Sequence, residues 1–260
     1  MTPASGHPLP YGDGRIPFLM VSDRQPDMSL ADLQVWLNAH GANIVVDGKR
    51  GPATRAAILD TFINTSAPAI TPKQMTAIAS RLGGTTRQLA AVAKVESSGG
   101  GWDDAGRLKC LYERHYFWRR IRIKIPFLSD PTPGGYTIDV NHDGINDSWE
   151  KVADAAMRNP IAAFESASWG KFQIMGAHAS TDPKRKVVFE GNAIDFVWWL
   201  TRAEYFHYEA LARFIEVNGL VQAFRALSDD PETCRAFARG YNGTRYAEGN
   251  YHGKLAAAMT

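Results

Sequence analysis

Residues 85–101 read Thr-Thr-Arg-Gln-Leu-Ala-Ala-Val-Ala-Lys-Val-Glu-Ser-Ser-Gly-Gly-Gly, and they are the most informative segment of the chain. Thr85 and Gln88 fit a capping box, in which each side chain bonds the backbone N–H of the other residue at the start of a helix. The glycines at 99–101 end the helix, because glycine adopts the left-handed backbone of a C-terminal cap without steric cost. The pattern predicts a helix between these two signals.

Glu96 lies on the apolar side of this predicted helix. Leu89, Val92 and Glu96 occupy positions i, i+3 and i+7, so they share one face. Apolar surroundings disfavour the charged form of a carboxyl group and raise its pKa, which a general acid for glycosidic bond cleavage requires. The alternative is a structural role, in which the carboxylate binds an arginine or a backbone amide. Position alone leaves both interpretations open.

Further helices are predicted on both sides of this segment, so the fold class is mainly α. A second capping box, Thr71-Pro-Lys-Gln74, starts a helix that ends at the glycines 83–84. Apolar periodicity predicts later helices at residues 160–166, 193–217, 220–227 and 231–239. Residues 127–149 are rich in Pro, Gly, Asp and Asn and allow at most short strands.

The first 68 residues are interpreted as a separate small domain of three-helix type. The first 27 residues are rich in Pro and Gly and are expected to be irregular. Helices are predicted at residues 29–41 and 52–62, with a turn at Asp47-Gly48 between them. Residues 65–72 hold two prolines and resemble a linker, so we place the boundary at Pro68. The predicted domains are residues 1–68 and 69–260.

Composition and missing motifs exclude several classes of protein. Lys and Arg exceed Asp and Glu by 29 − 27 = 2 charges, which is too small an excess for a dedicated nucleic-acid binder. Two cysteines cannot support a disulfide scaffold or a four-cysteine zinc site. The sequence contains no His-Glu-x-x-His zinc motif and no phosphate-binding loop motif, and because residues 1–14 are polar we expect no secretory signal. We expect a soluble monomer with no nucleic-acid partner and no stable membrane insertion.

A second group of ionisable residues lies among aromatic residues at 107–118, Arg-Leu-Lys-Cys-Leu-Tyr-Glu-Arg-His-Tyr-Phe-Trp. Glu113 is either the second carboxylate that glycoside hydrolysis by paired acids requires, or the partner of Arg114 or Arg119 in an ion pair. His115 suits a hydrogen-bonding support. The alternating run at 119–124, Arg-Arg-Ile-Arg-Ile-Lys, predicts a strand with one cationic face, either solvated or turned to an anionic polymer.

Long motifs in the larger domain resemble a known family. The order Glu-Ser, Gly-x-x-Gln-Ile and Tyr-Asn-Gly resembles the lysozyme-like superfamily of goose-type lysozymes and lytic transglycosylases. The longer motifs look like the N-acetylmuramidase domain of phage endolysins, over roughly residues 71–259. They are Val95-Glu-Ser-Ser-Gly, Gly106-Arg-x-x-x-Leu-Tyr-Glu-Arg-His115, Ser166-Ala-Ser-Trp-Gly-x-Phe-Gln-Ile-Met-Gly176 and Tyr241-Asn-Gly-x-x-Tyr-Ala-x-x-Asn-Tyr-His252.

This resemblance implies a lysozyme-like α-fold and cleavage of the β-1,4 bond between MurNAc and GlcNAc in peptidoglycan. It implies that Glu96 is the general acid and Glu113 the second catalytic carboxylate, with no cofactor needed for catalysis. The residues it suggests for substrate binding are Gln173, Tyr241, Asn242, His115 and Trp169. An enzyme of this kind is expected to stay in the host cytoplasm until another lysis protein gives it access to the wall.

The N-terminal part has a resemblance of its own. Leu33-Gln-x-x-Leu37-Asn-x-x-Gly41, followed by Val46-Asp-Gly-x-x-Gly-Pro-x-Thr54-x-x-Ala-Ile58, is similar to the peptidoglycan-binding domain of cell-wall hydrolases. Such a domain implies a wall-binding groove beside the turn at 47–52.

Two other functions stay open at this point. A lytic transglycosylase would use Glu96 without water and leave 1,6-anhydro ends. A non-catalytic wall-binding or virion structural protein would keep only the fold. Glu113 argues mildly against the transglycosylase, because that reaction can proceed with a single carboxyl group.

Residues 139–150, Asp-Val-Asn-His-Asp-Gly-Ile-Asn-Asp-Ser-Trp-Glu, fit the twelve-residue calcium-loop pattern. The oxygen ligands would come from Asp139, Asn141, Asp143, the Ile145 carbonyl, Asp147 and Glu150. The alternative is a polar surface loop with Asn and Asp turns. We expect a stand-alone loop in which Ca²⁺ has a structural role.

Overall fold

The structure is a computed structural model that describes residues 27–96, 99–136, 139, 142–143 and 146–260. The chain divides into two compact units. We call Met75–Ser98 with Ile215–Thr260 the helical unit, and Gln25–Gln74 with Gly99–Phe214 the mixed unit. These packing units are not the predicted domains 1–68 and 69–260, and that modular boundary stays a prediction.

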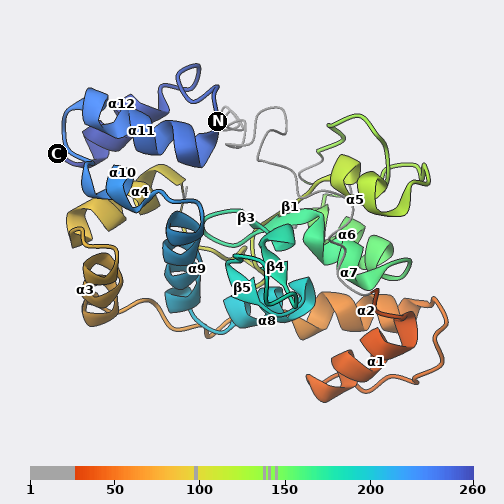
Figure 1. Cartoon of the computed structure of the whole chain (residues 1–260). Coiled ribbons are helices and arrows are strands. Elements are labelled where there is room, and N and C mark those ends of the chain that lie inside the picture. Colours follow the sequence, from red (N-terminus) through yellow and green to blue (C-terminus); the bar gives the residue numbers. More distant parts are fainter. Residues whose placement is uncertain (1–26, 97–98, 137–138, 140–141, 144–145) are drawn as a thin grey trace. The chain divides into compact units, whose positions relative to one another are not determined.

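Helices dominate both units, which confirms the mainly α fold class (Figure 1). Their bounds are α1 Leu30–Ala39, α2 Pro52–Thr61, α3 Pro72–Arg81, α4 Thr86–Glu96, α5 Arg114–Ile121, α6 Ser148–Ala156, α7 Pro160–Glu165, α8 Ala193–Thr201, α9 Glu204–Val217, α10 Val221–Arg225, α11 Pro231–Asn242 and α12 Tyr251–Ala258. A short 3₁₀ helix spans Gly176–His178.

In the described part of the chain the strands are short and lie in the mixed unit. They are β1 Cys110–Tyr112, β2 Ala167–Trp169, β3 Ile174–Met175, β4 Ala179–Ser180 and β5 Phe189–Glu190. An antiparallel sheet has the order β1-β2-β3, with Cys110 opposite Trp169 and Ser168 opposite Met175. Strands β4 and β5 form a separate parallel pair.

An aromatic cluster forms the core of the mixed unit. The rings of Phe62 and Trp149 are 5.4 Å apart, those of Trp149 and Trp169 5.1 Å, and those of Phe164 and Trp169 5.6 Å. All four side chains are buried, and large buried rings contribute most of the stabilisation in such a core. Phe62 follows α2, so the N-terminal helices pack into the same core as α6 and α7.

The predicted helix at 193–217 is two helices, α8 and α9, because carbonyls at the end of α8 bond to groups outside it. The Leu200 carbonyl lies 3.0 Å from Nε2 of His207, and the Thr201 carbonyl accepts a bond of 2.8 Å from the Asn64 amide. In a continuous helix, each of these carbonyls would instead accept from the backbone N–H four residues further along the chain.

The predicted strand at 119–124 is wrong. Its first three residues belong to α5, and Arg122 caps that helix with a left-handed backbone, φ 57°. The Arg122 N–H still donates to the Trp118 carbonyl at 2.7 Å, and the left-handed backbone at Arg122 then turns the chain out of the helix. Alternating charged residues therefore arise here from a helix end followed by a turn. Helices α5, α6 and α12 were also absent from the sequence prediction.

Candidate active site

Glu96 is the last residue of α4, whose start agrees with the predicted capping box. Gln88 Oε1 accepts from the Thr85 N–H at 2.8 Å, and the Gln88 N–H donates to Thr85 Oγ1 at 3.2 Å. Leu89 and Val92 are fully buried on the same face as Glu96, and α4 packs against α12. The helix therefore points its terminal carboxyl group toward an apolar interface.

Tyr251, at the start of α12, is the partner of this carboxyl group. Its hydroxyl donates to Glu96 Oε1. Burial raises the pKa of Glu96 to about 7, and the bond from Tyr251 partly opposes this effect because it stabilises the charged form. A substantial fraction of Glu96 is protonated at neutral pH, which is the state that a general acid needs.

Tyr241 and Asn242 end helix α11, in the same unit as Glu96. Tyr241 is buried and stacks between two rings, with centroid distances of 5.5 Å to Phe237 and 6.4 Å to Tyr251. It therefore supports Tyr251 from behind. Asn242 is half-buried and precedes Gly243, whose left-handed φ of 76° turns the chain away from the helix.

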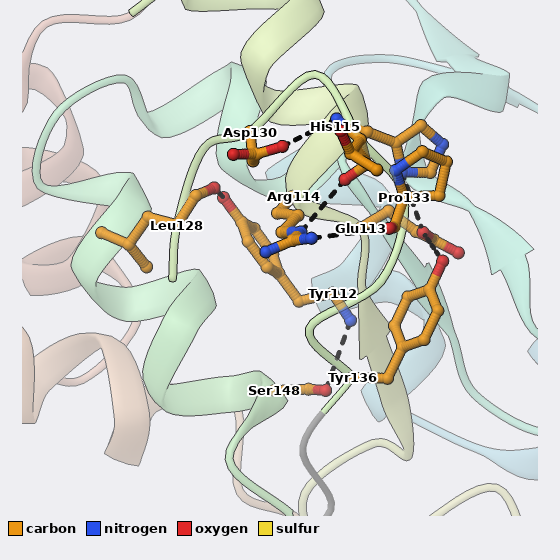
Figure 2. Close-up of polar contacts among 10 residues, drawn as sticks. Tyr112, Glu113, Arg114, His115, Leu128, Asp130, Pro133, Tyr136 and Ser148 are labelled. Carbon is orange, nitrogen blue, oxygen red and sulfur yellow. Dashed lines mark hydrogen bonds and ion pairs between the residues drawn. The ribbon is translucent and has the colours of Figure 1, made fainter. Parts of the chain in front are cut away.

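Glu113 lies between β1 and α5, and Figure 2 shows the polar contacts around it. Glu113 is 6% exposed. The Tyr136 hydroxyl donates to Glu113 Oε2 at 2.8 Å, and His115 Nδ1 lies 3.2 Å from the same oxygen. The Glu113 N–H donates to the Ser166 carbonyl at 2.8 Å, which fixes the backbone. This buried carboxyl group accepts a hydrogen bond from a phenol, and an imidazole lies beside it without making a hydrogen bond.

The arginine beside Glu113 makes other contacts. Arg114 donates to the Thr132 carbonyl at 3.1 Å and to the Pro133 carbonyl at 3.5 Å, so it braces the segment that carries Tyr136 (Figure 2). Burial, followed by the charge of Glu113, raises the pKa of the Tyr136 hydroxyl, which therefore remains a donor. Tyr136 was not among the residues singled out from the sequence.

Gln173 and Trp169 lie in and beside the β2–β3 hairpin, where both make internal contacts. The Gln173 amide donates to the Gly170 carbonyl at 2.9 Å and accepts from the Ser168 hydroxyl at 2.9 Å, while its side chain stays half-buried. Trp169 is 1% exposed, and its indole N–H donates to the Phe164 carbonyl at 2.9 Å. Trp169 is therefore a core residue in this structure, and this burial does not support substrate contact.

The two candidate carboxyl groups belong to different units, Glu96 to the helical unit and Glu113 to the mixed unit. Sequence motifs named both residues. The motif that ends at His252 includes Tyr251 but gave it no role, and Tyr136 lies outside every motif; neither contact follows from the apolar periodicity used to identify Glu96.

The predicted calcium loop is described only in part. Asn141 and Ile145 lie outside the described residues, whereas Asp139, Asp143, Asp147 and Glu150 are described. Asp147 is buried, and burial together with Asp147 raises the pKa of Glu150. Among the described residues, no group of three or more His, Cys, Asp or Glu side chains is placed to hold a metal ion. The calcium site stays a prediction.

Comparisons with known proteins agree with the motifs. The family model described as Muramidase, N-acetylmuramidase, matches residues 85–260, more than half of the chain. The crystal structure of Burkholderia AP3 phage endolysin matches with a TM-score of 0.63 and 28% sequence identity, over 91% of this chain and 95% of that chain. No curated protein matches. Within the described residues, every helix is too short or too polar to cross a membrane.

Proposed function

This chain belongs to the N-acetylmuramidase family, a family of peptidoglycan hydrolases, and we propose that it is an endolysin that cleaves the β-1,4 bond between MurNAc and GlcNAc. The observation that carries this proposal is the state of Glu96. It ends an apolar helix face, and burial raises its pKa to about 7. A carboxyl group in this state can give a proton to the leaving glycosidic oxygen at neutral pH.

Tyr251 supports this proton transfer. When Glu96 gives up its proton, the carboxylate that forms keeps the hydrogen bond from the Tyr251 hydroxyl. A hydrogen bond to the charged form lowers the free energy of that form, so it favours the product of the transfer. The stack of Tyr241 on Tyr251 keeps the phenol in position.

Glu113 is the second carboxyl group of the proposed mechanism. A hydrogen bond from Tyr136, with the His115 ring beside it, orients this carboxyl group, as is needed for a group that activates water or stabilises an oxocarbenium-like transition state. Asn242 and Gln173, both half-buried, are the proposed contacts for the sugar N-acetyl groups.

The substitution Glu96→Gln tests the acid. The amide keeps the shape of the side chain but has no proton to give, so clearing of purified peptidoglycan should fall roughly 10²- to 10⁴-fold, the usual contribution of a general acid. The melting temperature at pH 8 should be unchanged or higher, because the amide removes a charge whose burial is unfavourable. Unchanged clearing would exclude Glu96 from the mechanism.

The N-terminal helices are proposed to bind the wall. Gln34, which is buried, accepts from the Asp47 and Gly48 N–H groups at 3.0 and 2.8 Å and donates to Thr54 Oγ1 at 3.0 Å. The motif residues thus hold the turn against α1 and α2. A hollow of about 460 Å³ lies between α2 and the segment that follows α1. It is lined by His40, Gly41, Ala42, Asn43, Ile44, Ala53, Ala56, Ala57, Asp60 and Thr61.

The same proposal includes the route to the substrate. The chain acts as a monomer and meets peptidoglycan after another lysis protein opens the inner membrane.

A further inference from the structure

The segment that follows α5, residues 122–130, exposes large apolar side chains to solvent. Phe127 is 81% exposed and Ile123 is 62% exposed. Pro126, between them in the chain, is exposed as well. We call this segment the 122–130 loop; it follows α5 in Figure 1. Side chains of this size are usually buried, so an exposed pair in one short loop calls for a physical reason.

Hydrogen bonds hold the loop in one shape. The backbone groups of Ile125 and Ser129 exchange two bonds, each of 2.9 Å. The buried Ser129 hydroxyl donates to the Ile123 carbonyl. The hydroxyl of Tyr112, a buried residue of β1, donates to the Leu128 carbonyl at 2.8 Å (Figure 2). These hydrogen bonds therefore hold the loop in a conformation in which Phe127 is exposed.

Phe127 has a left-handed backbone, with φ 63°. A bulky L-residue adopts this conformation at a cost in conformational free energy, whereas glycine adopts it freely. An exposed aromatic side chain recovers little of that cost by packing inside the protein. Strain of this kind at a rigid, exposed position indicates a contact outside the chain.

Cations outnumber anions in the loop and in the helix before it. Residues 114–130 contain five, Arg114, Arg119, Arg120, Arg122 and Lys124, against one anion, Asp130. Arg120 is paired with Glu165 inside the unit. Arg122 lies over the Trp118 ring, 4.7 Å from its centroid, and the Lys124 side chain is 71% exposed, with Nζ 3.9 Å from Asp130. The tip is therefore both apolar and positively charged.

We propose that the 122–130 loop adsorbs to an anionic phospholipid bilayer. Phe127 and Ile123 enter the boundary between headgroups and acyl chains, and Arg122 and Lys124 meet the lipid phosphates. A bilayer accommodates a branched aliphatic side chain beside an aromatic one, whereas a polar sugar gains little from isoleucine. This adsorption is peripheral and reversible, inserts no spanning segment, and does not depend on the proposed glycosidase activity.

Flotation of the full-length protein with vesicles tests the proposal. The protein should float with vesicles of phosphatidylglycerol and phosphatidylethanolamine and not with phosphatidylcholine alone, and added salt should weaken the binding. Phe127→Gly should lower the partition of the protein onto these vesicles about tenfold, because the variant lacks the aromatic side chain that moves from water into the bilayer. Lys124→Gln should lower it about fivefold. Glycine suits the left-handed position, so Phe127→Gly should melt at or above the wild-type temperature.

Val45→Ser is the matched control, because Val45 is 77% exposed and distant in sequence from the loop. It should float like the wild type. The proposal is overturned if the protein ignores anionic vesicles, if Phe127→Gly floats as well as the wild type, or if Val45→Ser loses as much binding. It is also overturned if Phe127→Gly weakens clearing of purified peptidoglycan instead of flotation, since the loop would then serve the wall.

Discussion

The partner of the candidate acid is a tyrosine that is distant in the chain, and its hydrogen bond partly opposes the larger effect of burial on the pKa of that acid. Glu96 and Tyr251 are 155 residues apart, yet the phenol donates to the carboxyl group. The apolar spacing on α4 predicted that the Glu96 pKa would be raised. It could not predict the partner that opposes the rise, because that contact depends on how α12 packs against α4.

Tyr251→Phe should move the pH dependence of clearing. Glu96 acts in its protonated form, so activity falls as pH rises through its pKa, about 7 in the wild type. Removing the hydroxyl takes away a bond to the charged form, so the pKa rises and the falling limb moves to higher pH. The maximal rate should fall as well, because the carboxylate that forms has lost its donor. Clearing rates measured from pH 5 to 9 show both effects. If the falling limb of this pH profile stays in place or moves to lower pH, the assignment of Tyr251 as the donor to the catalytic Glu96 is contradicted.

At Glu113, the second carboxyl group, the sequence likewise identified the residue but not its hydrogen-bond partner. A motif identified Glu113, but Tyr136 comes from a segment rich in Pro and Gly, in which no periodic pattern marks a side chain as inward-facing. The sequence therefore predicts the chemical groups of the candidate site but not the contacts that the two phenols make with them.

At the scale of elements, one neutral histidine organises the turn between β2 and β3. His207 is buried; its Nδ1 accepts from the Lys171 N–H at 2.9 Å, and its Nε2 faces the Leu200 carbonyl at 3.0 Å. Burial lowers the pKa of His207 to about 4, so the ring stays neutral at physiological pH. A Cβ added at Gly170 would lie 2.7 Å from this ring, so only glycine fits there.

The variants Gly170→Ala and Gly219→Ala separate the cost of a left-handed backbone from the cost of a contact between an added Cβ and the His207 ring. Both glycines have φ +68°, but a Cβ at Gly219 meets nothing within 4 Å. Gly219→Ala should therefore lower the free energy of unfolding by about 1–2 kcal/mol, the left-handed cost alone. Gly170→Ala should cost roughly 1–3 kcal/mol more, because the His207 ring must also shift. Denaturant unfolding measures both; equal losses would show that the ring does not constrain Gly170.

Elements with local signals were predictable, and elements that depend on packing were not. Capping boxes place the starts of α3 and α4 because both partners lie within four residues. Helix α5 was predicted in part as a strand, since its basic residues alternate like those of a half-exposed strand. The helix ends partway through this run of basic residues, at the left-handed cap formed by Arg122, and the sequence pattern does not show that end.

The predicted calcium loop can be tested by thermal melting. If Ca²⁺ binds residues 139–150, excess Ca²⁺ should raise the melting temperature relative to a chelator, because a ligand of the native state stabilises it. Asp143→Ala should abolish that difference. Asp229→Ala, which removes an exposed carboxylate elsewhere, should keep it. Equal melting in Ca²⁺ and chelator would rule the site out.

At the scale of the whole molecule, the N-terminal helices are part of the mixed unit's core. Phe62 packs on Trp149 and Phe164, and the Trp36 indole donates to Asp195 at 2.8 Å. Deleting residues 1–68 therefore removes a buried ring, and losses of this kind cost about 3–5 kcal/mol. We expect the truncated chain to be destabilised, so truncation does not isolate wall binding.

Ala56→Arg tests wall binding without that loss. Ala56 is exposed and lines the hollow beside α2, so a long charged side chain should obstruct the hollow while the fold stays intact. Less of the variant should sediment with purified peptidoglycan at an unchanged melting temperature. Ala77→Arg, at an exposed position of α3, makes the same change elsewhere. If both variants sediment like the wild type, the hollow is not the binding site.

Mass spectrometry of peptidoglycan digested in H₂¹⁸O tests whether the protein hydrolyses the bond after MurNAc. A muramidase that uses water leaves a reducing MurNAc at each new end, and its C1 hydroxyl carries the label. We expect these labelled ends from the wild type and a large loss of them with Glu96→Gln. Unlabelled 1,6-anhydroMurNAc ends would contradict this expectation and indicate a lytic transglycosylase.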